Sequence, residues 1–129
     1  MELLHKDITD HIIKAFYSVY NALGYGFLEK VYENALYIEL TTIGFKVVKQ
    51  QYLQVFYKDA IVGEYFADLI VDDLIIIEIK AAEAIVLEHE YQLLNYLKAT
   101  DKEVGLLFNF GKKPEFKRKV FQNSNKNLQ

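Results

Sequence analysis

The chain has 129 residues, a length that fits one domain, and its 52% of hydrophobic residues exclude an intrinsically disordered protein. The formal net charge of −3 argues against a protein that coats nucleic acid through a general positive potential, but not against a nuclease, whose acidic site residues count toward that total. The chain contains no cysteine, no apolar run near the ~20 residues of a membrane span and no signal-peptide core, so we expect a cytoplasmic protein without disulfides, thiolate metal sites or a membrane anchor.

Two helices are predicted in the first part of the chain. Apolar residues recur at helical spacing from Ile8 to Leu23, and the stretch Asp7-Ile8-Thr9-Asp10 supplies candidates for the N-cap. The stretch Gly24-Tyr25-Gly26 ends this helix. A second helix is expected from about residue 28 to residue 43, where Gly44 is typical of a helix C-terminus.

From residue 45 the pattern changes to that of strands. β-Branched and aromatic residues predict three strands joined by short turns at Lys58-Asp59 and Asp72-Asp73, which form an antiparallel meander. These strands are expected at residues 45–57, 61–71 and 74–80.

A third helix is expected over residues 87–100, followed by a strand over 104–110 and an edge strand over 116–121. A strand that follows a crossover helix pairs in parallel, with a right-handed connection. The order of elements therefore predicts an α/β fold with one mixed sheet flanked by helices. We expect one domain over residues 1–121 and a polar C-terminal tail over 122–129.

Two acids and a lysine lie on neighbouring predicted strands. Asp68 ends the stretch Glu-Tyr-Phe-Ala-Asp, and Glu78 and Lys80 end the next strand, where their spacing of two puts them on one face. Metal-assisted hydrolysis of a phosphodiester needs such a set, because carboxylates hold Mg²⁺ or Mn²⁺ and an ammonium group positions water or offsets charge. A surface ion pair at the strand end is the alternative.

The length of the turn decides whether Asp68 can share a site with Glu78. A two-residue loop, Asp72-Asp73, would set Asp68 opposite Ile77 and turn its side chain away from Glu78. A shared site requires either a three-residue loop, such as Asp72-Asp73-Leu74, or a β-bulge near Asp68. We predict that the chain has one of these two devices.

Five short motifs follow one another along the chain. They are G-x-x-E-x-x-Y at 26–32, Tyr-Phe-Ala-Asp at 65–68, Glu-Ile-Lys-Ala at 78–81, His-Glu-Tyr-Gln at 89–92 and Gly-Leu-Leu-Phe-Asn-Phe-Gly at 105–111. Their order and spacing resemble the GxxExxY protein family, which is placed in the PD-(D/E)XK nuclease superfamily. The resemblance extends from about residue 5 to residue 121 and implies the restriction-endonuclease-like core, α-β-β-β-α-β.

The resemblance also implies roles for particular residues. Asp68, Glu78 and Lys80 match the motif acids and lysine, and Ala67 stands where the superfamily motif has proline. Glu29 matches a helix glutamate that joins Asp68 and Glu78 as a metal ligand in the exonuclease-like branches. The alternative for Glu29 is an acid that stabilises the first turn of its helix through the helix dipole.

Gln92 and Tyr96 match a Q-x-x-x-Y element of the same branches, and their spacing of four puts them on one helix face. From that face they could hydrogen-bond the substrate backbone or brace Lys80. Gln92 could instead be a buried amide, Tyr96 could serve packing alone, and Tyr32 of the first motif is expected in the core rather than in the chemistry.

The predicted function is hydrolysis of phosphodiester bonds in nucleic acid, in DNA more than in RNA, with Mg²⁺ or Mn²⁺ as cofactor. The alternative is a catalytically silent module of the same fold that binds nucleic acid or a protein partner. Because the chain has no separate specificity domain, a homodimer or another protein could supply substrate selection. A nucleotide hydrolase lacks support, since the chain has neither a G-x-x-x-x-G-K-[ST] loop nor a G-x-G-x-x-G turn.

Overall fold

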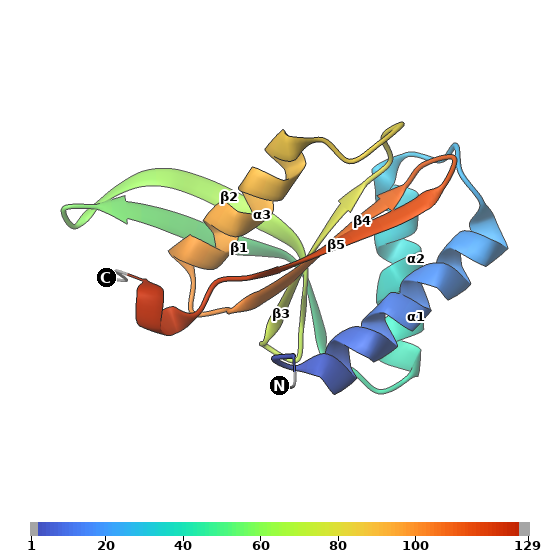
Figure 1. Cartoon of the computed structure of the whole chain (residues 1–129), viewed down its shortest axis with the longest axis horizontal. Helices are drawn as coiled ribbons and strands as arrows, with labels where there is room; N and C mark the ends of the chain where they lie inside the picture. The colour runs from blue at the N-terminus through green and yellow to red at the C-terminus, as the bar shows by residue number, and fades with distance from the viewer. Residues whose placement is uncertain (1–2, 127–129) are drawn as a thin grey trace.

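The computed structural model describes residues 3–126, and the elements in this part of the chain follow the predicted order. Figure 1 shows α1 (Lys6–Leu23), α2 (Glu29–Thr42), β1 (Val47–Tyr57), β2 (Ala60–Val71), β3 (Ile75–Lys80), α3 (Leu87–Ala99), β4 (Val104–Phe110) and β5 (Pro114–Val120). A short 3₁₀ helix, Asn123–Asn125, follows β5. Within residues 3–126, every helix is too short or too polar to span a bilayer.

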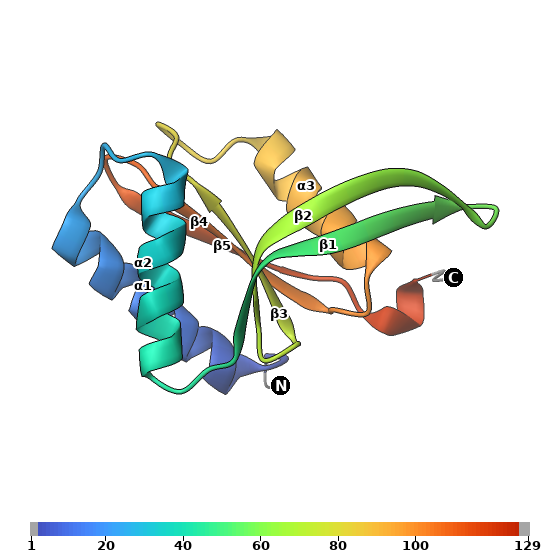
Figure 2. The ribbon, with the colours of Figure 1, turned by 180° about the vertical axis from the view of Figure 1, so that it is seen from behind.

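The five strands of this region form one mixed sheet in the order β1-β2-β3-β4-β5. β1, β2 and β3 pair antiparallel as a meander, β3 and β4 pair parallel across the α3 crossover, and β5 pairs antiparallel at the edge. Helices α1 and α2 lie on one side of the sheet and α3 on the other, which the two opposite views make visible (Figures 1 and 2). The predicted α/β fold is therefore confirmed.

The sheet carries an apolar cluster on each face. Ile75, Ile77 and Ile79 of β3 pack with α1 and α2, whereas Ile76 packs with α3. Successive side chains of a strand point to opposite faces, so β3 is buried on both. The same alternation puts Glu78 on the α3 face.

The β1–β2 hairpin extends well beyond the rest of the sheet. The last backbone pair between β2 and β3 is Leu69 opposite Ile77, while β1 and β2 stay paired to their ends. Their two-residue turn has positive φ at both Lys58 (49°) and Asp59 (67°), as type I′ hairpins require. We call residues 51–67 the hairpin arm, and the ribbon views show it projecting beside α3 (Figures 1 and 2).

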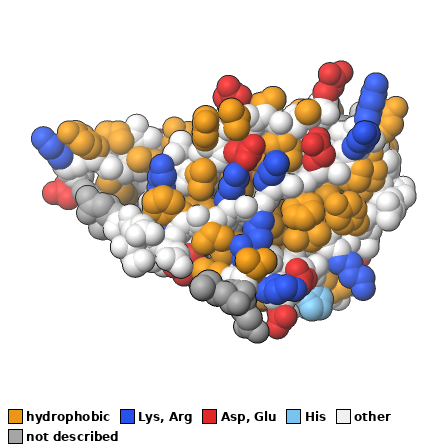
Figure 3. All heavy atoms as spheres, in the orientation of Figure 1, with side chains coloured by type: hydrophobic (Ala, Val, Ile, Leu, Met, Phe, Trp, Pro, Cys, Tyr) orange, Lys and Arg blue, Asp and Glu red, His pale blue; other side chains and the backbone are white. Residues whose placement is uncertain are grey.

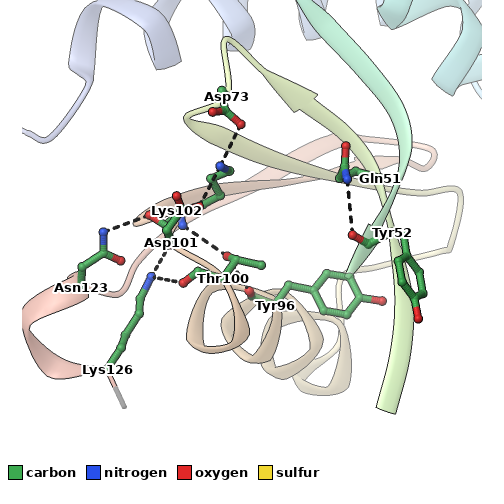
Figure 4. Close-up of polar contacts among 9 residues, drawn as sticks. All are labelled: Gln51, Tyr52, Asp73, Tyr96, Thr100, Asp101, Lys102, Asn123 and Lys126. Carbon is green, nitrogen blue, oxygen red and sulfur yellow. Dashed lines mark hydrogen bonds and ion pairs between the residues drawn. The ribbon is translucent and has the colours of Figure 1, made fainter. Parts of the chain in front are cut away.

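The N-cap of α1 is His5, which makes no side-chain capping bond, so the N-cap expected within Asp7-Ile8-Thr9-Asp10 is wrong. Asp7 lies in the first turn, where its charge favours the helix dipole. Near the C-terminus, Asn123 Nδ2 donates to the Asp101 carbonyl at 2.9 Å, and Lys126 Nζ donates to the Thr100 carbonyl at 3.0 Å (Figure 4). The rest of the expected tail, residues 127–129, lies outside the described residues, as do residues 1–2.

Candidate active site

The turn between β2 and β3 has the odd length that a shared site requires. Val71 pairs with Ile75, which leaves three residues, Asp72-Asp73-Leu74, in the turn. Both aspartates have positive φ, 50° and 57°. Continuing this register sets Asp68 opposite Glu78, so their side chains share a face, and the first of the two predicted devices is confirmed.

A lysine from the loop after α3 holds this turn in place. Lys102 Nζ contacts Asp73 Oδ1 at 2.8 Å and Asp101 Oδ1 at 2.8 Å (Figure 4). The Lys102 side chain is largely buried, whereas both carboxylates are exposed. The contact ties the three-residue turn to the loop between α3 and β4.

Backbone pairing between β2 and β3 ends at Leu69, the residue next to Asp68. Beyond this point, side chains make the hydrogen bonds between the two strands. Glu78 Oε2 accepts a hydrogen bond from the Asp68 backbone N at 2.8 Å, and Asp68 Oδ2 accepts one from the Ile79 backbone N at 2.8 Å. These reciprocal bonds satisfy amides that have no ladder partner where the strands diverge. We call this point, residues 68 and 78–79, the β2–β3 fork.

Burial raises the pKa of both carboxyl groups at the fork, and neighbouring negative charges add to the effect. Glu78 is only 4% exposed, and burial, followed by the charge of Asp68, raises its pKa to about 8. Burial also raises the pKa of Asp68, and the charge of Glu33 adds to the effect. Lys80 acts in the opposite direction on both groups, so its ammonium lies within electrostatic reach of them. Such a pair is one that a bound cation stabilises.

Two residues that the sequence did not suggest complete the acidic cluster. Glu33 on α2 is 4% exposed, and its Oε1 accepts a hydrogen bond from Gln50 Nε2 at 2.7 Å. The same Gln50 nitrogen lies 3.2 Å from Asp68 Oδ1. Gln50 has a φ of 51°, an uncommon value for a residue other than glycine, and its side chain bridges α2 to the fork.

The structure does not bring Glu29 into this cluster. Glu29 is exposed in the first turn of α2, and among residues 3–126 it has no hydrogen bond or ion pair with Asp68 or Glu78. Glu33, one turn later, lies there instead. The signal that could have identified Glu33 is its place beside Tyr32 on the buried face of α2.

Tyr32 belongs to the core, as expected. It is fully buried, its hydroxyl donates to the Gly24 carbonyl at 2.7 Å and accepts from the Phe27 backbone N at 3.2 Å, and its ring stacks on Phe110 with centroids 4.2 Å apart. Gly26 has a φ of 112°, which favours glycine. The G-x-x-E-x-x-Y motif thus shapes the connection between α1 and α2.

The α3 side of the site is formed by the predicted pair Gln92 and Tyr96. Gln92 Nε2 donates to the Tyr96 hydroxyl at 3.0 Å. Burial, followed by the charge of Glu78, raises the pKa of Tyr96 to about 12, so this hydroxyl stays protonated beside the acids. His89, one turn earlier, accepts a hydrogen bond from the Val86 backbone N at 3.2 Å and caps α3.

The donor set agrees in its chemistry with a divalent cation. Asp68, Glu78 and Glu33 offer hard carboxylate oxygens of the kind that Mg²⁺ and Mn²⁺ prefer, and a bound cation would offset the cost of ionising buried Glu78. However, no three histidine or carboxylate side chains within residues 3–126 stand close enough together to form a metal-binding group. In the structure the carboxylate oxygens of Asp68, Glu78 and Glu33 accept hydrogen bonds from backbone amides at the fork, from Gln50 and from Lys30.

A mixed sheet between helices, with two acids and a lysine where two of its strands diverge, defines a protein with a restriction-endonuclease-like core. The chain belongs to the PD-(D/E)XK nuclease superfamily, whose model matches residues 6–119. Its structure is also similar to the crystal structure of SSO0001, with a TM-score of 0.58 and 18% sequence identity, a likeness that shows the fold alone. The match covers 91% of this chain and 59% of SSO0001. No curated protein matches the sequence.

Proposed function

We propose that this chain is a divalent-metal-dependent nuclease of the GxxExxY family that hydrolyses phosphodiester bonds in nucleic acid, in DNA more than in RNA. The observation that carries the proposal is the position of Asp68 opposite Glu78 at the fork, with Lys80 within electrostatic reach of both. Membership of the nuclease superfamily supports phosphodiester chemistry at these residues.

Each side chain of the cluster has a proposed task. Asp68, Glu78 and Glu33 would hold Mg²⁺ or Mn²⁺, which when bound polarises the scissile phosphate and lowers the pKa of a water molecule. We place Glu33 in the position that the motif suggested for Glu29, because Glu33 is buried against the fork. Lys80 orients the attacking water and offsets negative charge on the phosphate oxygens.

Gln92 and Tyr96 have a positioning task in this proposal. The amide of Gln92 has a second hydrogen available for a phosphate oxygen of the substrate backbone, while its first hydrogen is donated to Tyr96. Tyr96 remains protonated at neutral pH, so it presents a neutral hydroxyl rather than a further negative charge beside Glu78.

The test is an incubation of the purified protein with single-stranded, double-stranded and branched DNA, and with RNA, in the presence of Mn²⁺. We expect cleavage that disappears with EDTA and in Glu78→Ala. Glu33→Gln is expected to lose cleavage as well, whereas the matched variant Glu29→Gln on the same helix retains it. Unchanged cleavage in Glu78→Ala, or no cleavage of any substrate by the folded protein, would refute the proposal.

A second candidate is a catalytically silent module of the same fold that binds nucleic acid or a protein partner. The observation that favours it is that Asp68 and Glu78 each bind a backbone amide of the neighbouring strand, so the acids stabilise the fork without a metal. Metal-independent binding of nucleic acid without cleavage would support this candidate.

We also propose that a homodimer supplies substrate selection. Native mass spectrometry that shows only monomer would refute the homodimer.

A further inference from the structure

A groove with a volume of about 590 Å³ adjoins the acidic cluster on the α3 side of the sheet. It lies between α3 and the hairpin arm and is lined by residues of both. Two of its lining residues, Gln92 and Tyr96, also form the α3 side of the candidate active site. A molecule bound in the groove would therefore lie beside the fork. Its volume falls within the range of about 300–1,000 Å³ that is common for ligand sites.

Aromatic rings line the groove from both sides. Phe56 and Tyr65 come from the hairpin arm, and Tyr91 and Tyr96 come from α3. Three of these rings are well exposed: Phe56 by 42%, Tyr65 by 45% and Tyr91 by 56%. The Tyr65 and Tyr96 rings lie with centroids 5.5 Å apart at an angle of 49°, and the Tyr96 ring extends from α3 toward the arm (Figure 4). Such rings offer open faces on which flat groups can stack.

The polar lining is rich in amides and carries no net charge. Gln54, Gln92 and Asn95 provide carboxamides, each with donors and an acceptor that suit the edges of nucleobases. The charged lining residues are Glu88 and Lys98, which have opposite signs. A surface that follows the phosphates of a duplex needs an excess of positive charge, which this lining lacks. In Figure 3, Lys and Arg side chains lie instead across the middle of the face that β5 and α3 present.

We propose that this groove binds the unpaired bases of a single-stranded stretch of nucleic acid, and that the protein therefore prefers single strands or single-stranded flaps to duplex. This inference rests on the proposed nuclease function, because the groove opens beside the acidic cluster. In a duplex, the faces of the bases stack on one another and are closed to protein rings. In a single strand each base offers a face, so stacking on Tyr65 and Tyr91 needs no particular sequence.

The test measures binding separately from cleavage. Fluorescence anisotropy of a labelled oligothymidine and of a labelled duplex of equal length is recorded in EDTA, where a metal-dependent nuclease does not cut. We expect the wild-type protein to bind the single strand more tightly than the duplex. Tyr65→Ala and Tyr91→Ala are each expected to weaken single-strand binding about 5- to 100-fold, the usual loss for one stacked base, and to leave duplex binding unchanged.

Two tyrosines outside the groove serve as matched controls. Tyr57 lies near the tip of the same arm with 63% of its surface exposed, and Tyr25 lies between α1 and α2 with 58% exposed. Tyr57→Ala and Tyr25→Ala are expected to bind the single strand as the wild type does. Melting temperatures of all four variants, measured in the same buffer, identify any loss that comes from unfolding.

Failure of the groove and failure of the nuclease function give different results. Equal single-strand affinity in wild type, Tyr65→Ala and Tyr91→Ala overturns the groove proposal, whether or not the protein cuts, and leaves the aromatic lining to a protein partner. If Tyr65→Ala loses single-strand binding but no substrate is cleaved with Mn²⁺, the groove proposal stands and the nuclease function fails.

Discussion

Replacement of Asp68 by asparagine tests the repulsion at the fork directly. The substitution keeps the size of the side chain and an oxygen that can accept the hydrogen bond from the Ile79 backbone N, but it removes one of two facing charges. The pKa of Glu78 is about 8, against a usual value of 4.5, with burial as the first cause and the charge of Asp68 as the second. At about 1.4 kcal/mol per pH unit, the ionised form of Glu78 is disfavoured by on the order of 5 kcal/mol.

The share of this free energy that Asp68 supplies sets the size of the expected effect. Because burial is the larger cause, we assign to Asp68 about 1–2 kcal/mol, which corresponds to a rise of roughly 3–10 °C in the melting temperature of a domain of this size. The gain should be largest at about pH 9, where both carboxylates of the wild type are ionised. It should be smallest at about pH 5, where Glu78 is protonated in the folded protein.

A thermal-shift titration with Mg²⁺ or Mn²⁺, at both pH values, measures the two effects together. We expect the metal to raise the melting temperature of the wild type and to leave that of Asp68→Asn unchanged, since the variant lacks a charged ligand. Glu29→Gln, which removes an exposed acid, is the matched control and should respond as the wild type does. A variant less stable than the wild type at about pH 9 would refute the repulsion, and a wild type that ignores both metals would refute the metal site.

The same cluster and its surroundings also determine the pH dependence of stability, the affinity for metal and the cost of losing the Tyr32 hydroxyl. The free energy of unfolding of the metal-free wild type should fall by a few kcal/mol as the pH rises from about 4.5 to about 8, because folded Glu78 holds its proton more tightly than the unfolded chain does. Urea denaturation at a series of pH values measures this slope. A stability that rises with pH in this window would contradict the prediction. Glu33→Gln should weaken Mn²⁺ binding about tenfold or more in isothermal titration calorimetry, whereas Glu29→Gln should leave it unchanged. Equal effects of the two substitutions would mean that Glu29 is a metal ligand as well. Tyr32→Phe should lower the free energy of unfolding by about 1–2 kcal/mol in urea denaturation, because the Gly24 carbonyl loses its hydrogen-bond donor. The rise in melting temperature on addition of metal should be unchanged in this variant. Loss of that rise would give Tyr32 a role at the site.

The elements of the fold could be predicted from the sequence because their periodicity is strong. Four of the six residues of β3 are isoleucines, and the strand is buried on both faces, as such β-branched runs are. The register could not be decided in the same way. Leu74 continues the apolar run, so the sequence allowed it in the strand, whereas the structure places it in the turn after Asp72 and Asp73, which both have a left-handed backbone.

The acidic cluster could be predicted only in part, since part of it depends on where β2 leaves the sheet. Asp68, Glu78 and Lys80 lie on adjacent strands, and local spacing brings them together once the register is known. Glu33 and Gln50 join them because the divergence of β2 from β3 opens the fork toward α2, which is a tertiary feature. Glu29 and Glu33 lie one turn apart on the same helix, and the motif resemblance pointed to Glu29, which is exposed. The position of Glu33 beside Tyr32 on the buried face of α2 was the signal for the other acid.

The fork also links the chemistry to the shape of the molecule. Asp68 lies on β2 directly after the hairpin arm, while Glu78 lies on β3, which pairs with β4 in the centre of the sheet. The angle between the arm and the sheet therefore sets the spacing of the two carboxylates. The arm itself is a two-stranded ribbon, which has little stability on its own. Side chains such as Leu53 and Ala67 pack it against α3. Whatever fixes the angle of the arm, such as the packing of Leu53 and Ala67 against α3, therefore also fixes the spacing of the two carboxylates.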